Sequence, residues 1–405
     1  MDNTYKLFET GQLGPITIRN RTIRAAAFEG MSQENGVTDA LIDYHRSVAK
    51  GGVGMTTVAY AAVSKSGISF PHQLWLRKEV VEDLKQLTKA VHDEGAKASI
   101  QLGHCGNMAD KSVTGQRPFA PTGGVNWYGP TFPKTMSKAD INQVINDFQQ
   151  AVLLAHEAGF DAVEIHAGHG YLISQFLSPY TNKRKDEYGG SFENRSRFLV
   201  QVLEGIKAIL PSEMAMLVKM NSSDGFDGGI TFEEAKRIAK LIESCGAHAI
   251  VVSGGFVSRA PMFVLRGAMP IDIMAYYMKN PFLKFFVKLF GGSLIKSVPF
   301  KEGYFMDVAQ EIQGEIDIPV VLVGGMNSTE SINSAFDRGF EWIAIARALI
   351  HDTGFVNKLR DAEIAQSRCT ICNYCIAKMY SGTMACHFNE HNLPADLVQK
   401  IKAIS

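Results

Sequence analysis

The chain has 405 residues, with Lys plus Arg and Asp plus Glu balanced at 41 each. Apolar residues make up 46% and charged residues 20% of the chain, which is typical of a globular protein with a large core. The balanced charge argues against a nucleic-acid partner. The opening residues MDNTYKLFETGQ lack the basic and apolar regions of a secretory signal, so we expect a cytoplasmic protein.

Short apolar runs alternate along the chain with longer segments of helical period. The apolar runs are Thr22–Ala27, Val53–Ala59, Ala96–Leu102, Ala162–Ile165, Met216–Met220, Ala249–Val252, Val320–Val323 and Trp342–Ala346. The helical segments are Asp39–Lys50, Lys78–Glu94, Lys138–Ala158, Phe192–Leu210, Phe232–Cys245 and Ser328–Arg338. This alternation is compatible with a (β/α)8 TIM barrel or with a doubly wound open sheet, and we favour the α/β barrel. In a barrel, catalytic residues gather at the C-terminal ends of the strands.

We expect two parts in the chain. Residues 1–365 are predicted to form the barrel, with an apolar insertion at about 256–304 after the sixth strand. Residues 366–405 are predicted to form a short Cys-rich C-terminal extension.

The fourth apolar run leads directly into a group of polar ring side chains. The sequence DAVEIHAGHGY places His166, His169 and Tyr171 at the end of the predicted strand and in the following loop. Two imidazoles can donate hydrogen bonds to one oxygen, and a phenol can deliver a proton at neutral pH. The alternative is that the histidines cap the strand while the tyrosine packs. For three such residues together, we favour a catalytic role.

These residues belong to a longer stretch that resembles a known family. The segment EIHAGHGYLISQFLSPYTNKRKDEYGGSFENRSRF is similar to the signature of the old yellow enzyme family of flavin oxidoreductases. The resemblance extends from LFETGQLGPITIRNR to RCTICNYC. It implies an FMN-containing barrel that takes electrons from NADH or NADPH and gives a hydride from flavin N5 to the β-carbon of an activated alkene. It also implies that His166 and His169 hold the substrate carbonyl while Tyr171 protonates the α-carbon.

The same resemblance implies further FMN contacts. Gln101 ends the third strand, where the family uses a glutamine on the flavin pyrimidine edge. Lys219 stands where many relatives have an arginine near flavin N1 and O2, and a lysine supplies a point charge rather than a planar fork. Gly324, Gly325 and Arg347 follow the seventh and eighth strands, where barrels usually bind phosphate. The predicted FMN site also includes Ala26, Ala27, Ala59 and Ala346.

The end of the first strand departs from one branch of the family. One bacterial branch has a cysteine and a tyrosine at the positions that we align with Phe28 and Gly30. The thiol that tunes the flavin potential in that branch is therefore absent. Phe28 is predicted either to contact the substrate or to pack.

A second departure is the apolar segment 262–290. It is rich in Met, Phe, Tyr and Leu, and it contains the charged residues Arg266, Asp272, Lys279, Lys284 and Lys288. No uninterrupted run approaches the ~20 apolar residues of a membrane span, so we expect no transmembrane segment. The segment could be extra core, a lid over a bulky apolar substrate, a dimer contact or a helix on a membrane surface.

Four of the six cysteines crowd together near the end of the chain, whereas Cys105 and Cys245 stand alone. Cys369, Cys372, Cys375 and Cys386 have the spacing C-x2-C-x2-C-x10-C. This spacing resembles the trimethylamine dehydrogenase and 2,4-dienoyl-CoA reductase branch of the family, which implies a [4Fe–4S] cluster beside FMN. Structural zinc and free thiols are the alternatives.

Two functions therefore stay open. The first is an ene-reductase that passes a hydride from NAD(P)H through FMN to an α,β-unsaturated carbonyl compound, with an apolar enone as the expected small-molecule substrate. The second is an amine or alkene dehydrogenase subunit that passes electrons through an iron–sulfur cluster to a partner protein. The carbonyl-binding histidines favour the first. A homo-oligomer or an electron-transfer partner is compatible with either function.

Overall fold

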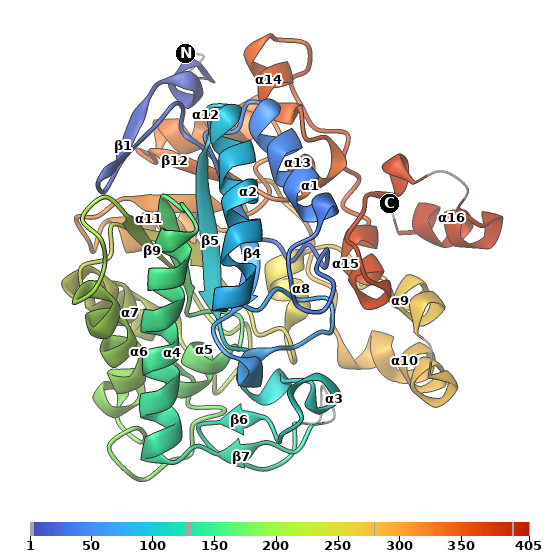
Figure 1. Cartoon of the computed structure of the whole chain (residues 1–405). Helices are drawn as coiled ribbons and strands as arrows, with labels where there is room; N and C mark the ends of the chain where they lie inside the picture. The colour runs from blue at the N-terminus through green and yellow to red at the C-terminus, as the bar shows by residue number, and fades with distance from the viewer. Residues whose placement is uncertain (1–3, 127–130, 279, 391–392, 405) are drawn as a thin grey trace.

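Eight parallel strands close into a barrel, which confirms the predicted (β/α)8 fold and excludes the open sheet (Figure 1). A computed structural model describes residues 4–126, 131–278, 280–390 and 393–404. In chain order, the barrel strands are β3 (Thr22–Arg24), β4 (Met55–Ala62), β5 (Lys97–Gly103), β8 (Ala162–His166), β9 (Ala215–Asn221), β10 (Ala249–Ser253), β11 (Val320–Val323) and β12 (Trp342–Ile345). Each of the eight coincides with a predicted apolar run.

Helices connect successive strands. The longer ones are α1 (Asp39–Lys50), α2 (Val81–Asp93), α4 (Lys138–Glu157), α6 (Phe192–Lys207), α7 (Phe232–Ser244), α11 (Met306–Gln313) and α12 (Thr329–Asp337). Their buried residues recur at helical spacing, and side-chain caps fix several starts, as Thr231 and Glu234 do in a capping box on α7. The sequence analysis did not predict α11, which completes the unit after β10.

Alternation along β8 decides which side chains enter the barrel. Val163 and Ile165 pack outward in the large core beneath the helices, whereas Ala162 packs in a second core inside the barrel. Because successive side chains of a strand point to opposite faces, Glu164 and His166 share the inward face with Ala162. The register aligns Gln101 with Glu164 and His166 with Lys219. Polar groups from three neighbouring strands therefore meet at one end of the barrel.

Two small sheets lie outside the barrel. The antiparallel strands β1 (Gly11–Leu13) and β2 (Ile16–Ile18) precede β3, and their apolar residues pack into the inner core beside Trp342. The strands β6 (Phe119–Ala120) and β7 (Lys134–Thr135) form a separate parallel pair between β5 and α4. Neither sheet was predicted.

The insertion after β10 packs against the C-terminal part of the chain (Figure 1). The insertion contains α8 (Pro261–Leu265), α9 (Ile271–Tyr277) and α10 (Pro281–Leu294), and the C-terminal part contains α15 (Tyr374–Lys378) and α16 (Ala395–Lys402). Ile273 and Met274 share a small core with Tyr374, Leu397 and Ile401. The hydroxyls of Tyr277 and Tyr374 are 2.6 Å apart. The insertion thus contributes to a satellite core that it shares with the C-terminal extension.

The interpretation of the whole insertion as extra core is wrong for α10. Five of its large apolar side chains are exposed, with Phe282 at 86%. Among the described residues, no helix has the length and apolar character needed to cross a membrane. Lys279 lies outside the described residues.

Candidate active site

The structure brings His166, His169 and Tyr171 together. The ring centroid of His166 lies 5.0 Å from that of His169 and 4.5 Å from that of Tyr171, in both cases edge to face. His166 ends β8, whereas His169 and Tyr171 occupy the loop before α5 (Leu172–Leu177). The predicted trio is therefore one compact group at the C-terminal end of the barrel, where such folds place their chemistry.

Both imidazoles are held in the neutral form. Burial lowers the pKa of His166 well below its ordinary value, with further lowering from His169 and Lys219. Burial, and then Lys219, lowers the pKa of His169 to about 3. A neutral imidazole offers one N–H donor. The backbone N–H of Gly168 donates to His166 Nδ1 at 3.3 Å, which leaves the proton of His166 on Nε2.

His169 is held in a strained backbone conformation. Its φ of +59° lies in the left-handed region that non-glycine residues rarely adopt. Its backbone N–H donates to Asn221 Oδ1 at 2.9 Å, and its Nε2 lies 2.7 Å from Ser253 Oγ at the end of β10. The Asn221 amide in turn donates to Asp224 and to the Gly255 carbonyl, at 2.9 and 2.8 Å. Sequence reasoning missed these supports, although Asn221 and Ser253 both end strands.

Aromatic side chains line the tyrosine side of the group. The ring of Tyr60, at a bulge in β4, lies 5.0 Å from Tyr171 and 6.1 Å from His166. The Tyr60 hydroxyl is 2.8 Å from Ser69 Oγ, and burial raises the pKa of Tyr60 well above its ordinary value. Phe28 contacts Tyr60, Phe70 and His72, with ring centroids 5.3 to 6.2 Å apart. Phe28 thus belongs to an aromatic cluster that reaches Tyr171 through Tyr60.

Gln101 and Lys219 meet at a third residue that the sequence analysis did not name. Glu164 accepts a hydrogen bond from Gln101 Nε2 at 2.5 Å and pairs with Lys219 Nζ at 2.8 Å. All three residues are 3% exposed. Their polar ends suit a flavin pyrimidine edge, which needs both donors and acceptors. Glu164 compensates the charge of Lys219, so the pair presents less positive charge than the lysine alone would.

The loop after β11 and the start of α13 (Arg347–His351) form the predicted phosphate site. Gly324 and Gly325 have φ values of +117° and +76°, and a Cβ on Gly324 would lie 2.9 Å from Phe305. The backbone N–H of Gly325 has no acceptor among the described residues. Arg347 donates to Asn373 Oδ1 at 2.7 Å and lies over the Phe300 ring. An unpaired N–H, two glycines and a cation are the groups that an FMN phosphate needs.

The remaining predicted FMN contacts are alanines, three of them just after β3 or β12 and one, Ala59, at the register shift inside β4. Ala26, Ala27 and Ala346 are partly exposed, whereas Ala59 is buried. The N–H of Ala59 donates to both carboxylate oxygens of Glu29 at 3.0 Å, and Arg24 binds Glu29 at 2.6 Å. This N–H is therefore committed within the protein. The residues present otherwise fit FMN, and their individual contacts to it stay predictions.

The four clustered cysteines lie next to the predicted phosphate site. Burial raises the pKa of Cys369 and raises that of Cys375 to about 12, and Arg347 opposes both shifts to a smaller extent. Cys369, Cys372 and Cys386 all lie close enough to raise the Cys375 pKa further. Within the part of the chain that the structure describes, no three metal-ligating side chains are positioned to hold a single ion. The iron–sulfur cluster stays a prediction.

Comparison with known proteins gives consistent results. The model of the NADH:flavin oxidoreductase / NADH oxidase family matches residues 6–289. A 4,4'-dithiodibutanoate disulfide reductase of Rhodococcus erythropolis is 37% identical over 382 residues, which cover 94% of each chain. An NADH oxidase of Thermoanaerobacter brockii is 31% identical over 91% of this chain and 52% of its own length. This chain thus spans about half the length of the second relative.

A solved structure shows the same fold. The complex of 2-naphthoyl-CoA reductase with 2-naphthoyl-CoA superimposes with a TM-score of 0.81 at 24% sequence identity. The match covers 98% of this chain and 58% of that chain.

Proposed function

Because the chain belongs to the NADH:flavin oxidoreductase / NADH oxidase family, we propose that it is an FMN-dependent ene-reductase acting on α,β-unsaturated carbonyl compounds. The family assignment makes it a flavin-dependent oxidoreductase with NADH or NADPH as electron donor. The finer assignment, reduction of a C=C bond, is supported by one observation. The neutral imidazole of His166 has a second neutral imidazole, His169, and a phenol, Tyr171, with ring centroids 5.0 and 4.5 Å from its own.

The histidine pair is suited to hold a carbonyl oxygen. When the substrate receives a hydride at its β-carbon, negative charge develops on that oxygen, and preorganised N–H donors stabilise it. His166 offers Nε2–H, because its Nδ1 already accepts from Gly168. Ser253 and Asn221 hold the ring and the backbone of His169 in place, which limits its reorganisation during the reaction. FMN, when bound, supplies the hydride that it has taken from NAD(P)H.

Tyr171 completes the reaction in this proposal. The imidazoles are neutral, and each is engaged in holding the carbonyl, so the α-carbon needs a separate proton donor. Tyr171 lies edge to face with His166 and is therefore beside the same small molecule. The ring of Tyr60 also packs near Tyr171, with the centroids 5.0 Å apart.

The alternative of an amine dehydrogenase has less support. A substrate ammonium group needs an anion or an acceptor cluster near the reacting carbon. Among the described residues, the polar contacts of the His166 and His169 rings are to a backbone N–H and a hydroxyl, and none is to a carboxylate. Burial is the main cause that lowers the pKa of both imidazoles, and Lys219 lowers both further, so this buried site disfavours an unpaired cation.

The test separates the two half-reactions of the flavin. We expect His166→Ala with His169→Ala to slow reoxidation of the reduced enzyme by a cyclic enone while NAD(P)H still reduces the flavin at nearly the parent rate. We expect Tyr171→Phe to slow the same oxidative step by roughly 10²–10⁴, the usual contribution of general acid catalysis. Tyr188→Phe is the matched control, because Tyr188 is a buried tyrosine whose hydroxyl donates to Gln201.

Stopped-flow absorbance of the flavin measures both steps. Equal slowing of reduction and reoxidation in the histidine variant would argue against carbonyl binding by this pair. A Tyr171→Phe enzyme that reduces the enone at the parent rate would show that the proton comes from another donor.

A further inference from the structure

The helix α10 presents its apolar face to solvent. Its exposed apolar side chains follow the spacing i, i+3, i+4, i+7, i+8, which places them on one side of a helix. They are Phe282, Phe285, Phe286, Leu289 and Phe290, with exposures of 86, 66, 58, 58 and 40%. We call this set the α10 apolar face.

The opposite side of α10 is the one that packs on the protein. Gly291 is buried, and a Cβ there would lie 3.2 Å from the side chain of Ile271 at the start of α9. Val287 and Lys284, which lie one and two turns before Gly291 on this side, are partly buried. The helix is therefore oriented with its most apolar side outward, the reverse of a helix that serves the core.

The sequence around this face is basic. Residues 273–301 contain Lys279, Lys284, Lys288, Lys296 and Lys301 and no Asp or Glu, although the whole chain has no net charge. Of these, Lys288, Lys296 and Lys301 are exposed. None of the lysines at 284, 288, 296 and 301 forms an ion pair with another residue that the structure describes. The exposed cationic charge is therefore carried by Lys288 within α10 and by Lys296 and Lys301 just after it, and no ion pair with a described residue compensates it.

We propose that α10 lies on the surface of an anionic lipid bilayer, with the α10 apolar face between the headgroups and the first part of the acyl chains. A helix with bulky apolar residues on one side and lysines beside them binds such surfaces through burial and charge attraction together. Its 14 residues are fewer than the ~20 needed for a span, so the helix lies in the interface rather than across it.

A second copy of the chain is a poorer occupant. A symmetric contact through the α10 apolar face would bring two copies of the same acid-free, lysine-bearing segment together, and like charges at such a contact repel. An anionic surface instead complements the exposed Lys288, Lys296 and Lys301. The proposal is independent of the flavin chemistry, because none of its residues belongs to the candidate active site.

Flotation of the full-length holoprotein with lipid vesicles tests this. We expect binding to vesicles that contain phosphatidylglycerol, weaker binding to phosphatidylcholine alone, and loss of binding at high salt. Phe285→Ser with Phe286→Ser should weaken the partition coefficient at least about tenfold, because the apolar anchor is removed. Lys288→Glu with Lys296→Glu should weaken it by about tenfold or more, because each surface lysine contributes attraction to anionic lipid.

Matched controls are available elsewhere on the surface. Leu153→Ser removes an apolar side chain of α4 that is 40% exposed, and Lys50→Glu reverses an exposed charge at the end of α1. Both controls should bind vesicles like the parent. The flavin absorption spectrum and the thermal midpoint verify folding of every variant, and the lysine variant decides the outcome if the serine variant fails to fold.

Two results would overturn the proposal. One is that the parent binds neutral and anionic vesicles equally, or binds neither. The other is that analytical ultracentrifugation finds a dimer that the Phe285→Ser, Phe286→Ser variant loses, while the parent does not float with vesicles. That second result would assign the face to another copy of the chain.

Discussion

At the scale of single residues, Glu164 is a member of the candidate site that the sequence analysis did not name. Its carboxylate accepts from Gln101 and pairs with Lys219 inside the barrel, at 2.5 and 2.8 Å. A buried charge costs several kcal/mol unless it is paired and hydrogen-bonded. Glu164 therefore permits Lys219 to remain buried beside the predicted flavin edge, and it holds the Gln101 amide in one orientation.

We predict that Glu164→Gln leaves Lys219 without its partner and lowers the free energy of unfolding by about 3–5 kcal/mol. Urea denaturation of the protein saturated with FMN measures this change. The control Glu233→Gln breaks a pair with Lys236 in which the glutamate is 77% exposed, and it should change stability by less than about 1 kcal/mol. Equal effects of the two substitutions would show that the pair with Lys219 is dispensable.

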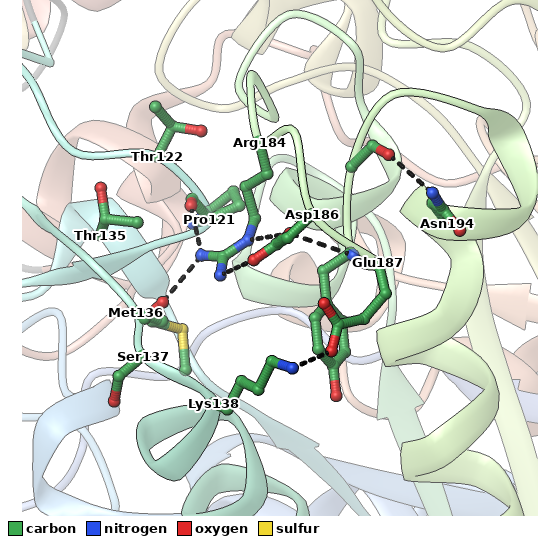
Figure 2. Close-up of polar contacts among 12 residues, drawn as sticks. Pro121, Thr122, Thr135, Met136, Ser137, Lys138, Arg184, Asp186, Glu187 and Asn194 are labelled. Atoms are coloured by element: carbon green, nitrogen blue, oxygen red, sulfur yellow. Dashed lines mark hydrogen bonds and ion pairs between the residues drawn. The ribbon is translucent and has the colours of Figure 1, made fainter.

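At the scale of elements, the segment after α5 is fixed to the outer sheet by one arginine (Figure 2). Arg184 donates to the backbone carbonyls of Pro121 and Met136 at 2.9 and 2.8 Å and to both carboxylate oxygens of Asp186. A second link joins Lys138 of α4 to Glu187. The planar guanidinium fork reaches all of these acceptors at once, which a lysine cannot do. This clamp secures the chain that leaves Tyr171 and α5.

We predict that Arg184→Lys lowers the free energy of unfolding by about 1.5–3 kcal/mol, the value of a hydrogen bond from a charged donor. Amide hydrogen exchange in residues 180–190 should accelerate at the same time, because the segment loses its anchor. Arg197→Lys is the control, since the exposed Arg197 donates to the Glu187 carbonyl in the same region. Unchanged exchange in the Arg184 variant would place the anchor elsewhere.

At the scale of the whole molecule, several histidines are buried in the neutral form. Burial lowers the pKa of His104 and of His169 to about 3, and it lowers the pKa of His45 and His166 as well. In the unfolded chain these groups titrate near 6.5. Between these two values the unfolded chain binds more protons than the folded protein. The contribution of these histidines to the free energy of unfolding is therefore fully present above about pH 6.5 and is lost as the pH falls toward 3.

We predict that the free energy of unfolding decreases between pH 6.5 and 5 by up to about 1.4 kcal/mol per pH unit for each such histidine. Urea denaturation at intervals across this range gives the slope, and most carboxylates remain ionised there. His104→Gln should reduce the slope of the free energy of unfolding against pH by about the contribution of one titrating histidine. His104 is 1% exposed, and its pKa in the folded protein lies far below its unfolded value. A slope that stays unchanged in this variant would mean that His104 is protonated in the folded protein.

Local sequence was sufficient to predict the barrel and the grouping of His166, His169 and Tyr171 at one strand end. A buried parallel strand requires a short apolar run, and a covering helix requires apolar residues at helical spacing. Both patterns can therefore be recognised from residues that are close in the sequence. His166, His169 and Tyr171 lie within six residues of one another, and the end of one strand necessarily brings them to the same face. Gln101, Lys219 and Arg347 could be placed only through the family resemblance and the strand ends.

The remaining features depend on contacts between residues far apart in the chain. Glu164 contacts Gln101 and Lys219 on the two neighbouring strands. Asn373 binds Arg347 and also donates to the carbonyls of Arg266 and Ala268, about 100 positions earlier in the chain. No local pattern determines such pairs, because strand register and helix docking follow from packing of the whole core. The tertiary structure likewise decided that α10 packs through Gly291 against Ile271 of α9 and leaves five apolar side chains in solvent.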